Sequence, residues 1–351
     1  MILGFAVKND IIGTNPCTER RCIYIMKKRL FYTAIVSIYS LLLTSCSQNG
    51  NNISEYEIIN HELMFLDEED VASSYHLNQN GTRDNTPLCL VPVASGYTLY
   101  SNSLATIDAS NAHEGYIMVN YTGVNPKVKL QITGPNSVTY TYNLYNGYEA
   151  FPLSAGSGNY KVAIYENVTG NQYSTAISKT FPVSITNTFG PNLYPNQYVD
   201  FTIDSLVVAK AMELSENCMN DLEVVTKVYN YITTNLTYDH YKAATVQSGY
   251  TSNVDYILEC GTGICLDYAA VMTSMLRSQN IPTRLEVGYA GTAYHAWIST
   301  YITDVGWVNG IIQFDGVSWS LMDPTFAANS SESALKAFIG NGSNYQTKYI
   351  Y

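Results

Sequence analysis

The middle of the chain has a short-period pattern of apolar and polar residues. Between residues 97 and 185 the two kinds alternate in short runs, which is typical of strands with one buried face. The clearest runs are 116–121, 128–132 and 160–165. Glycine, asparagine and proline separate the runs. We therefore predict an all-β domain over residues 96–186.

After residue 206 the pattern changes, and apolar residues recur every three or four positions. This spacing predicts helices over 221–235 and 266–279, the second of which ends before Pro282. Strand-like runs follow at 284–289, 294–298 and 319–322. The mixture predicts an α+β domain over residues 187–351, entered through a linker at 187–196.

The short, evenly spaced strands of residues 96–186 favour an antiparallel β-sandwich of immunoglobulin-like type. The chain holds 31 tyrosines, and exposed ones in such a sandwich could stack on sugars. Tyrosine also suits strands for packing reasons alone. We therefore expect this domain to be a spacer that presents the C-terminal domain, in preference to a sugar-binding adhesin.

The N-terminal part resembles a targeting signal. Lys27-Lys28-Arg29 precede the apolar run 30–43, as a basic segment precedes the hydrophobic segment of a signal peptide. The run is short for a membrane-spanning helix. It ends in Leu43-Thr44-Ser45-Cys46, which resembles a bacterial lipobox, in which the cysteine is lipidated and becomes the mature N-terminus.

These features divide the first 95 residues into three expected parts. Residues 1–25 would be an extension upstream of the true start at Met26, and 26–45 a lipoprotein-type signal peptide. Residues 46–95 have the polar composition of a flexible tether. The expected location is extracytoplasmic, either anchored to a bacterial membrane through a lipid on Cys46 or secreted.

Charge argues against a nucleic-acid partner. Only 13% of residues are charged, and the net charge is −11. Without residues 1–45 the remainder carries 12 basic and 27 acidic residues, a net charge of −15. Such a surface repels phosphate backbones, and no basic stripe offsets it. The seven cysteines are too sparse for a disulfide scaffold.

Three C-terminal segments supply a thiol, an imidazole and a carboxylate, in that order. They are Gly263-Ile264-Cys265-Leu266-Asp267-Tyr268-Ala269, Tyr294-His295-Ala296-Trp297 and Leu321-Met322-Asp323-Pro324-Thr325. Cys265 would begin the predicted helix, where unpaired N–H groups favour a thiolate. His295 could then accept the thiol proton while Asp323 fixes the imidazole tautomer.

Each of these residues also has an ordinary structural interpretation. A lone cysteine in an apolar helix is usually a small core residue, and a histidine beside tryptophan is usually packed. Asp-Pro at the end of a strand is commonly a turn. The three together, in this order and with these neighbours, favour the catalytic interpretation.

The stretch from Leu206 to Phe326 resembles the transglutaminase-like superfamily, in the microbial branch of the papain-fold cysteine enzymes. Three motifs carry the resemblance: Gly-x-Cys-x-Asp-Tyr-Ala, His-Ala-Trp and Asp-Pro-Thr, in the family's order. Asn280 stands where glycine is usual at the helix end, and asparagine also tolerates the left-handed conformation.

The resemblance implies a papain-like transglutaminase core with Cys265 as nucleophile, His295 as general base and Asp323 as orienting acid. It implies attack on amide bonds through a thioester acyl-enzyme, as a peptidase, an amidase or a protein-glutamine acyltransferase. The substrate would be a protein or peptide, a cell-wall peptide being one candidate, and no metal or other cofactor is needed. The alternative is a catalytically inactive binding or structural module at the cell surface.

Further expectations concern the surroundings of the site. The Cys265 N–H would supply one oxyanion donor, and Tyr250 or Tyr256 could supply a second. Cys260 is expected to be a buried free thiol; a bond from Cys260 to Cys265 would silence the nucleophile. Asn309-Gly310 and Asp315-Gly316 predict a hairpin that either lines a substrate groove or extends the sheet.

Overall fold

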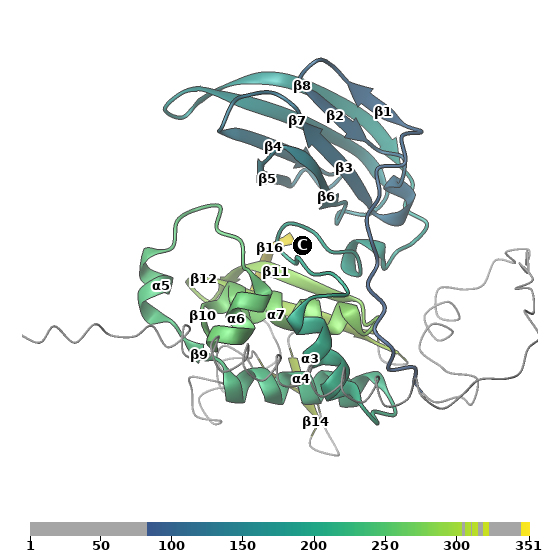
Figure 1. Cartoon of the computed structure of the whole chain (residues 1–351), viewed down its shortest axis with the longest axis vertical. Helices are drawn as coiled ribbons and strands as arrows, with labels where there is room; N and C mark the ends of the chain where they lie inside the picture. The colour runs from purple at the N-terminus through teal and green to yellow at the C-terminus, as the bar shows by residue number, and fades with distance from the viewer. Residues whose placement is uncertain (1–82, 304–305, 310, 315–318, 323–344) are drawn as a thin grey trace, which may run out of the picture. The chain divides into compact units, whose positions relative to one another are not determined.

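Figure 1 presents a computed structural model that describes residues 83–303, 306–309, 311–314, 319–322 and 345–351. Its first part contains two four-stranded antiparallel sheets, ordered β1-β2-β3-β6 and β5-β4-β7-β8. The bounds are β1 (Leu99–Ser101), β2 (Ala105–Asp108), β3 (Tyr116–Tyr121), β4 (Val128–Thr133), β5 (Thr139–Leu144), β6 (Gly147–Pro152), β7 (Gly158–Thr169) and β8 (Gln172–Val183). The predicted strands are thus confirmed, while the immunoglobulin-like type stays a prediction.

Strand β4 illustrates why this part of the chain forms sheets. Val128, Leu130 and Ile132 are buried, whereas the residues between them are partly exposed. A period of two places one set of side chains in the core and the other on the outer face. Lys129 therefore belongs to the outer face of its sheet.

In the C-terminal part, the described residues form a four-stranded antiparallel sheet, ordered β13-β12-β11-β16, and five helices. The helices are α3 (Leu206–Ser215), α4 (Asp221–Asn235), α5 (His240–Thr245), α6 (Val254–Cys260) and α7 (Cys265–Ser278). The sheet strands are β11 (Thr283–Ala290), β12 (Ala293–Ile302), β13 (Gly306–Asn309) and β16 (Tyr345–Ile350). Two small strand pairs are also described, β9 (Thr237–Tyr238) with β10 (Thr262–Gly263) and β14 (Ile311–Phe314) with β15 (Trp319–Met322).

Helix α7 is the central element of this domain. It packs against α3, α4 and α6 and against β11 and β12, and every residue from Asp267 to Ser278 is buried. Figure 1 shows α7 running beside β11 and β12. The predicted helices agree with α4 and α7 within one residue. Asn280 has φ 57°, which confirms the left-handed conformation expected after the helix.

A buried arginine fixes the C-terminal end of α7. Arg277 donates hydrogen bonds to the main-chain oxygens of Thr283 (2.9 Å), Tyr194 (2.7 Å) and Tyr351 (2.7 Å). Burial lowers the pKa of its guanidinium. Since three carbonyls accept its protons, one side chain joins the helix to the linker, to β11 and to the end of β16.

Residues 83–95 do not behave as part of the expected tether. Arg83 forms a buried ion pair with Asp221 of α4 (2.8 Å) and donates a hydrogen bond to the Gln279 main-chain oxygen (2.5 Å). The tether prediction for 46–95 is therefore wrong over this stretch, because an arginine and a carboxylate 138 positions apart pair in the interior. Residues 46–82 and the signal segment lie outside the described residues.

The predicted linker at 187–196 is packed tightly against the first part. At Gly190 a Cβ would lie 1.8 Å from the Glu114 main-chain oxygen, so only glycine fits. The Asn187 side chain donates to the Glu114 carboxylate (2.8 Å). Across the described ranges, no helix is long and apolar enough to cross a membrane.

The segment predicted to form a hairpin takes part in two separate strand pairings. Strand β13 pairs with β12 and extends the main sheet, whereas β14 pairs with β15. Trp307 of β13 packs on Phe189 and Tyr301, with the Arg284 guanidinium over its ring. These contacts favour sheet extension over a groove lining for Trp307.

Candidate active site

Cys265 is the first residue of α7. Its predecessor Ile264 has extended geometry, with φ −98° and ψ 177°, so the chain turns sharply into the helix. The thiol is free and partly exposed, while the helix behind it is buried. The first-turn N–H groups of a helix favour an anionic sulfur.

Gly263 makes the start of this helix possible by leaving space, not by a special backbone angle. Its φ lies outside the positive range. A Cβ there would lie 2.7 Å from the Asp267 Cβ, so a larger residue would collide with the Asp267 side chain. That side chain folds back and accepts a hydrogen bond from the Ile264 N–H (2.8 Å).

His295 lies in the middle of the sheet. It is buried on β12, opposite Gly288 of β11, and its ring stacks on Trp297 with centroids 6.2 Å apart. A Cβ on Gly288 would meet the Gln346 main-chain oxygen at 2.0 Å, so glycine lets β16 approach closely. Strand β16 is thereby held against β11, which in turn pairs with the strand that carries the imidazole.

Cys265 and His295 line one cavity of about 630 Å³. The structure thus brings together two of the three residues that the sequence predicts for catalysis. Asp323 lies outside the described residues, as does Cys46. A volume of this size suits a peptide segment or another small ligand.

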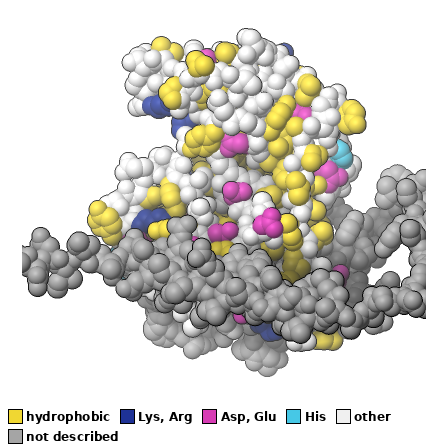
Figure 2. Space-filling model, in the orientation of Figure 1, with side chains coloured by type: hydrophobic (Ala, Val, Ile, Leu, Met, Phe, Trp, Pro, Cys, Tyr) yellow, Lys and Arg dark blue, Asp and Glu magenta, His cyan; other side chains and the backbone are white. Residues whose placement is uncertain are grey.

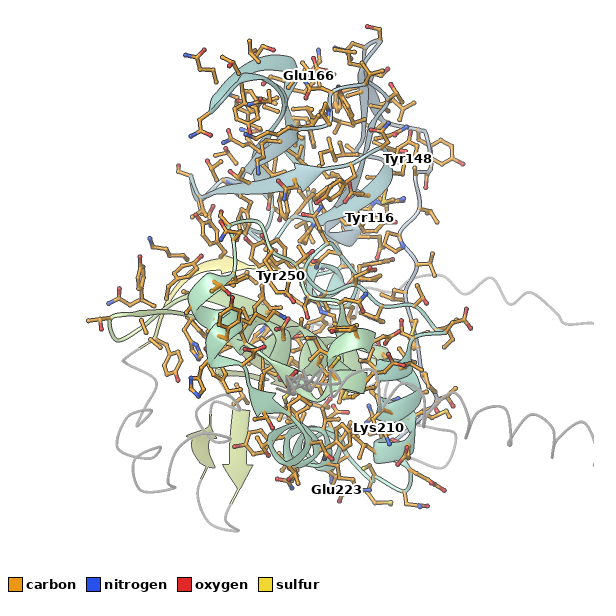
Figure 3. The ribbon with its side chains drawn as sticks, turned by 60° about the vertical axis from the view of Figure 1, so that its left-hand side comes forward. Tyr116, Tyr148, Glu166, Lys210, Glu223 and Tyr250 are labelled. Atoms are coloured by element: carbon orange, nitrogen blue, oxygen red, sulfur yellow. The ribbon has the colours of Figure 1, made fainter. Side chains whose placement is uncertain are left out.

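A cluster of three polar side chains supports the nucleophile helix. Lys242 of α5 donates hydrogen bonds to the carboxylate of Asp267 (2.6 Å) and to the hydroxyl of Tyr250 (2.6 Å). Tyr250, labelled in Figure 3, donates in turn to the other Asp267 oxygen (2.7 Å). The Asp267 side chain is fully buried and that of Lys242 is 25% exposed.

Charges in this cluster stabilise one another. Burial lowers the pKa of Lys242, but its hydrogen bonds with Asp267 and Tyr250 outweigh burial and raise the pKa overall. Burial also raises the pKa of Tyr250. Lysine therefore stays protonated and the phenol stays neutral near neutral pH. The cluster joins α5 and the loop after it to the first turn of α7.

Neither tyrosine fits the expected role of second oxyanion donor. The hydroxyl proton of Tyr250 is committed to Asp267. Tyr256 lies on α6, half exposed, and is not among the described residues around the cavity. A phenol has one proton to donate, so Tyr250 cannot serve a substrate without losing Asp267.

The sequence did not single out several residues of the cavity. Tyr294 lies close enough to Cys265 that the thiolate contributes to raising its pKa, after burial and three other tyrosines. Lys129, Thr141 and Asn143 reach the cavity from β4 and β5. Alternation showed that the outer positions of these strands avoid the core, but it could not show what they face.

Cys265 is not bonded to Cys260, because Cys265 is free. Cys260 is buried but disulfide-bonded, so the expectation of a free thiol there is wrong. Over the part of the chain that the structure describes, no three His, Cys, Asp or Glu residues form a group that could hold a metal ion.

Comparison with known proteins found a family similarity within the C-terminal domain. Residues 208–310 match the model of the transglutaminase-like superfamily. This part of the chain therefore resembles a transglutaminase-like core. The match includes Cys265 and His295, and it ends before Asp323.

Other similarities extend beyond this core. Over 227 residues the chain is 25% identical to the UPF0252 protein MJ1282 of Methanocaldococcus jannaschii, an alignment that covers 58% of this chain and 63% of that protein. The chain therefore spans less than two thirds of this relative.

Solved structures similar to the chain include three proteins. A candidate cysteine protease from Cytophaga hutchinsonii is 16% identical with a TM-score of 0.31, covering 65% of this chain and 68% of that one. A candidate protease from Parabacteroides distasonis is 16% identical with a TM-score of 0.25, covering 52% and 37%. Red sea bream transglutaminase is 14% identical with a TM-score of 0.26, covering 60% and 48%.

Proposed function

We propose that the protein is a cysteine enzyme that acts on amide bonds through a thioester intermediate. One observation carries the proposal: a free cysteine at the first position of a buried helix lines the same cavity as a histidine, within a transglutaminase-like core. A thiol, a base and a cavity for the acyl group are the parts that nucleophilic acyl transfer needs.

In the proposed reaction the Cys265 sulfur attacks the amide carbon, and its proton passes to His295. A C–S bond forms, the C–N bond breaks, and the amine leaves with the proton from His295. Water or a second amine then attacks the thioester, which releases a carboxylic acid or a new amide and restores the thiol. Asp323 is proposed to orient the imidazole, as the family resemblance implies, and the Cys265 N–H to stabilise the oxyanion.

The remaining assignments rest on the sequence alone. We propose that the two N-terminal sheets form an immunoglobulin-like sandwich and that Cys46 carries a lipid outside the cytoplasm. Palmitate labelling of the wild-type chain and of a Cys46→Ser variant in a bacterial host tests the second point. Label that remains on the variant would refute it.

The test of activity uses the chain without residues 1–45. It is incubated with a glutamine-containing peptide and a tagged primary amine, and the products are weighed by mass spectrometry. Tag incorporation indicates acyl transfer, and cleavage indicates hydrolysis. Cys265→Ala should abolish both, whereas Cys89→Ala should not, although both thiols are free and partly exposed.

A second readout does not depend on the choice of peptide. Iodoacetamide should modify Cys265 at neutral pH much faster than Cys89, because burial raises the pKa of the Cys89 thiol. Equal rates at the two cysteines, together with no product from any peptide, would refute the enzyme and favour the inactive binding module.

A further inference from the structure

The cavity that holds Cys265 and His295 has a wall made by the N-terminal sheets. Lys129 of β4 and Thr141 and Asn143 of β5 line it together with the two candidate catalytic residues. This placement differs from the role of a spacer expected for these sheets. A spacer would leave the site to the C-terminal domain alone.

Direct contacts hold this wall in place. The Gln197 side chain donates a hydrogen bond to the Asn143 main-chain oxygen (2.8 Å), and Asn143 donates to the Gly249 oxygen (3.4 Å). Gly249 has φ +86°, and a Cβ there would lie 2.8 Å from the side-chain amide nitrogen of Asn143. The Asn143 side chain therefore lies directly against the loop beside the site.

Aromatic packing joins the same two parts of the chain. The ring of Tyr351 meets those of Tyr140 and Tyr142 edge-on, with centroids 5.6 and 5.9 Å apart. The Tyr140 hydroxyl accepts a hydrogen bond from the Ile350 N–H (3.2 Å). Apolar residues of both parts belong to one continuous core cluster. The wall is thus a packed part of the site.

The charges around the cavity are unusual for an acidic protein. The chain has a net charge of −11, and Figure 2 shows acidic side chains spread over the face it presents. The described residues that line the cavity include Lys129 but no aspartate or glutamate. Its ammonium bonds to the side-chain oxygen of Asn143, a neutral acceptor. The positive charge of the wall therefore has no carboxylate partner in the lining.

The rest of the lining suits a peptide chain beside that charge. Five tyrosines surround the cavity in addition to Tyr250, and they offer ring faces for apolar groups: Tyr198, Tyr238, Tyr294, Tyr349 and Tyr351. Tyr198 and Tyr351 stack with centroids 4.0 Å apart, which fixes part of this surface. Rigid aromatic side chains lose little entropy when a ligand binds.

We propose that Lys129 binds a carboxylate of the substrate, so that the preferred substrates are peptides with an acidic side chain near the attacked amide. The inference rests on the proposed function, and it adds the substrate class and assigns specificity to the N-terminal sheets. Anionic peptides are otherwise repelled by the surface of this protein, so the lysine selects them at the site.

Binding to the inactive Cys265→Ala chain tests the inference. The probes are acetylated, amidated and fluorescently labelled heptapeptides with a central glutamine, in which Glu, Gln or Lys occupies each flanking position in turn. At one position or more, Glu should bind roughly fivefold more tightly than Gln, as expected for a partly exposed ion pair. Fluorescence anisotropy gives the dissociation constants.

Variants of the wall make the assignment specific. Lys129→Gln should remove the preference for Glu, Lys129→Glu should reverse it in favour of Lys, and Lys129→Arg should keep it. Lys161→Gln is the matched control, because Lys161 lies in the same sheet on β7 but is exposed and outside the described lining. It should leave the preference unchanged.

The possible outcomes separate this inference from the enzyme proposal. Binding that is equal for Glu, Gln and Lys at every position, absent for all peptides, or unaltered by Lys129→Gln overturns the role of Lys129. Charge-independent turnover by the wild-type chain would do so while leaving the enzyme proposal in place. Acid-selective binding without turnover or selective alkylation of Cys265 would support Lys129 and refute the enzyme.

Discussion

Replacing Lys242 by methionine should destabilise the C-terminal domain. The substitution leaves the fully buried Asp267 carboxylate with the hydroxyl of Tyr250 and the Ile264 N–H as its remaining donors. Removal of one member of a buried ion pair costs about 3–5 kcal/mol. Two donors remain and 25% of the Lys242 side chain is exposed, so we expect a loss of about 2–3 kcal/mol.

Urea unfolding followed by tryptophan fluorescence measures this loss. All three tryptophans lie in the C-terminal domain, at positions 297, 307 and 319, so the signal reports on the domain that is changed. Lys210→Met is a close control. Lys210 is also 25% exposed and also lies over a tyrosine ring, but its partner Glu213 is 64% exposed. The control should lose less than about 0.5 kcal/mol.

The pH dependence of the difference provides a second check. The pKa of Lys242 in the folded chain is raised above its ordinary value of 10.5. Its contribution to stability is therefore complete below about pH 10.5 and is lost as the pH rises through the folded pKa. The gap between wild type and Lys242→Met should be constant from pH 7 to 10 and shrink above that. A loss at pH 7 no larger than that of Lys210→Met, or a gap that widens in alkali, would refute the reasoning.

Two further predictions concern the start of α7 and the buried tyrosines. Gly263→Ala should destabilise the domain by about 1–3 kcal/mol and slow the alkylation of Cys265, because the new methyl group would collide with the Asp267 side chain; a variant as stable and as reactive as wild type would contradict this. Burial raises the pKa of Tyr194 and of Tyr268 to about 12, so their stabilising effect is present below pH 10 and is lost as the pH rises above it. Absorbance at 295 nm should then show tyrosines that titrate late in the native chain but near pH 10 in urea, and a single native transition near pH 10 would count against it.

Local patterns were enough to predict the elements that carry the candidate residues. Helix α4 has the predicted bounds, and α7 begins one residue before them, at Cys265. Amphipathic spacing and the following proline determine such helices locally. The same patterns placed His295 on a strand.

The supporting groups could not be predicted in this way. Lys242 and Tyr250 come from a short helix and a loop, where no periodic pattern indicates a partner. Their meeting with Asp267 depends on tertiary packing. The alternation in β4 predicts that Lys129 avoids the core, but only the arrangement of the sheets brings it to the cavity. The steric room that Gly263 leaves for the Asp267 side chain also depends on the folded structure.

The hydrogen bonds of Arg277 determine which part of the chain can finish folding first during protein synthesis. The guanidinium becomes part of the nascent chain 74 residues before its Tyr351 acceptor. At ribosomal rates of about 5–20 residues per second, that acceptor follows roughly 4–15 s later. The N-terminal sheets can close from neighbouring strands in the meantime, whereas the interior around α7 stays incomplete until β16 and Tyr351 emerge. A chaperone that holds the nascent chain during this interval should therefore increase the yield of folded protein.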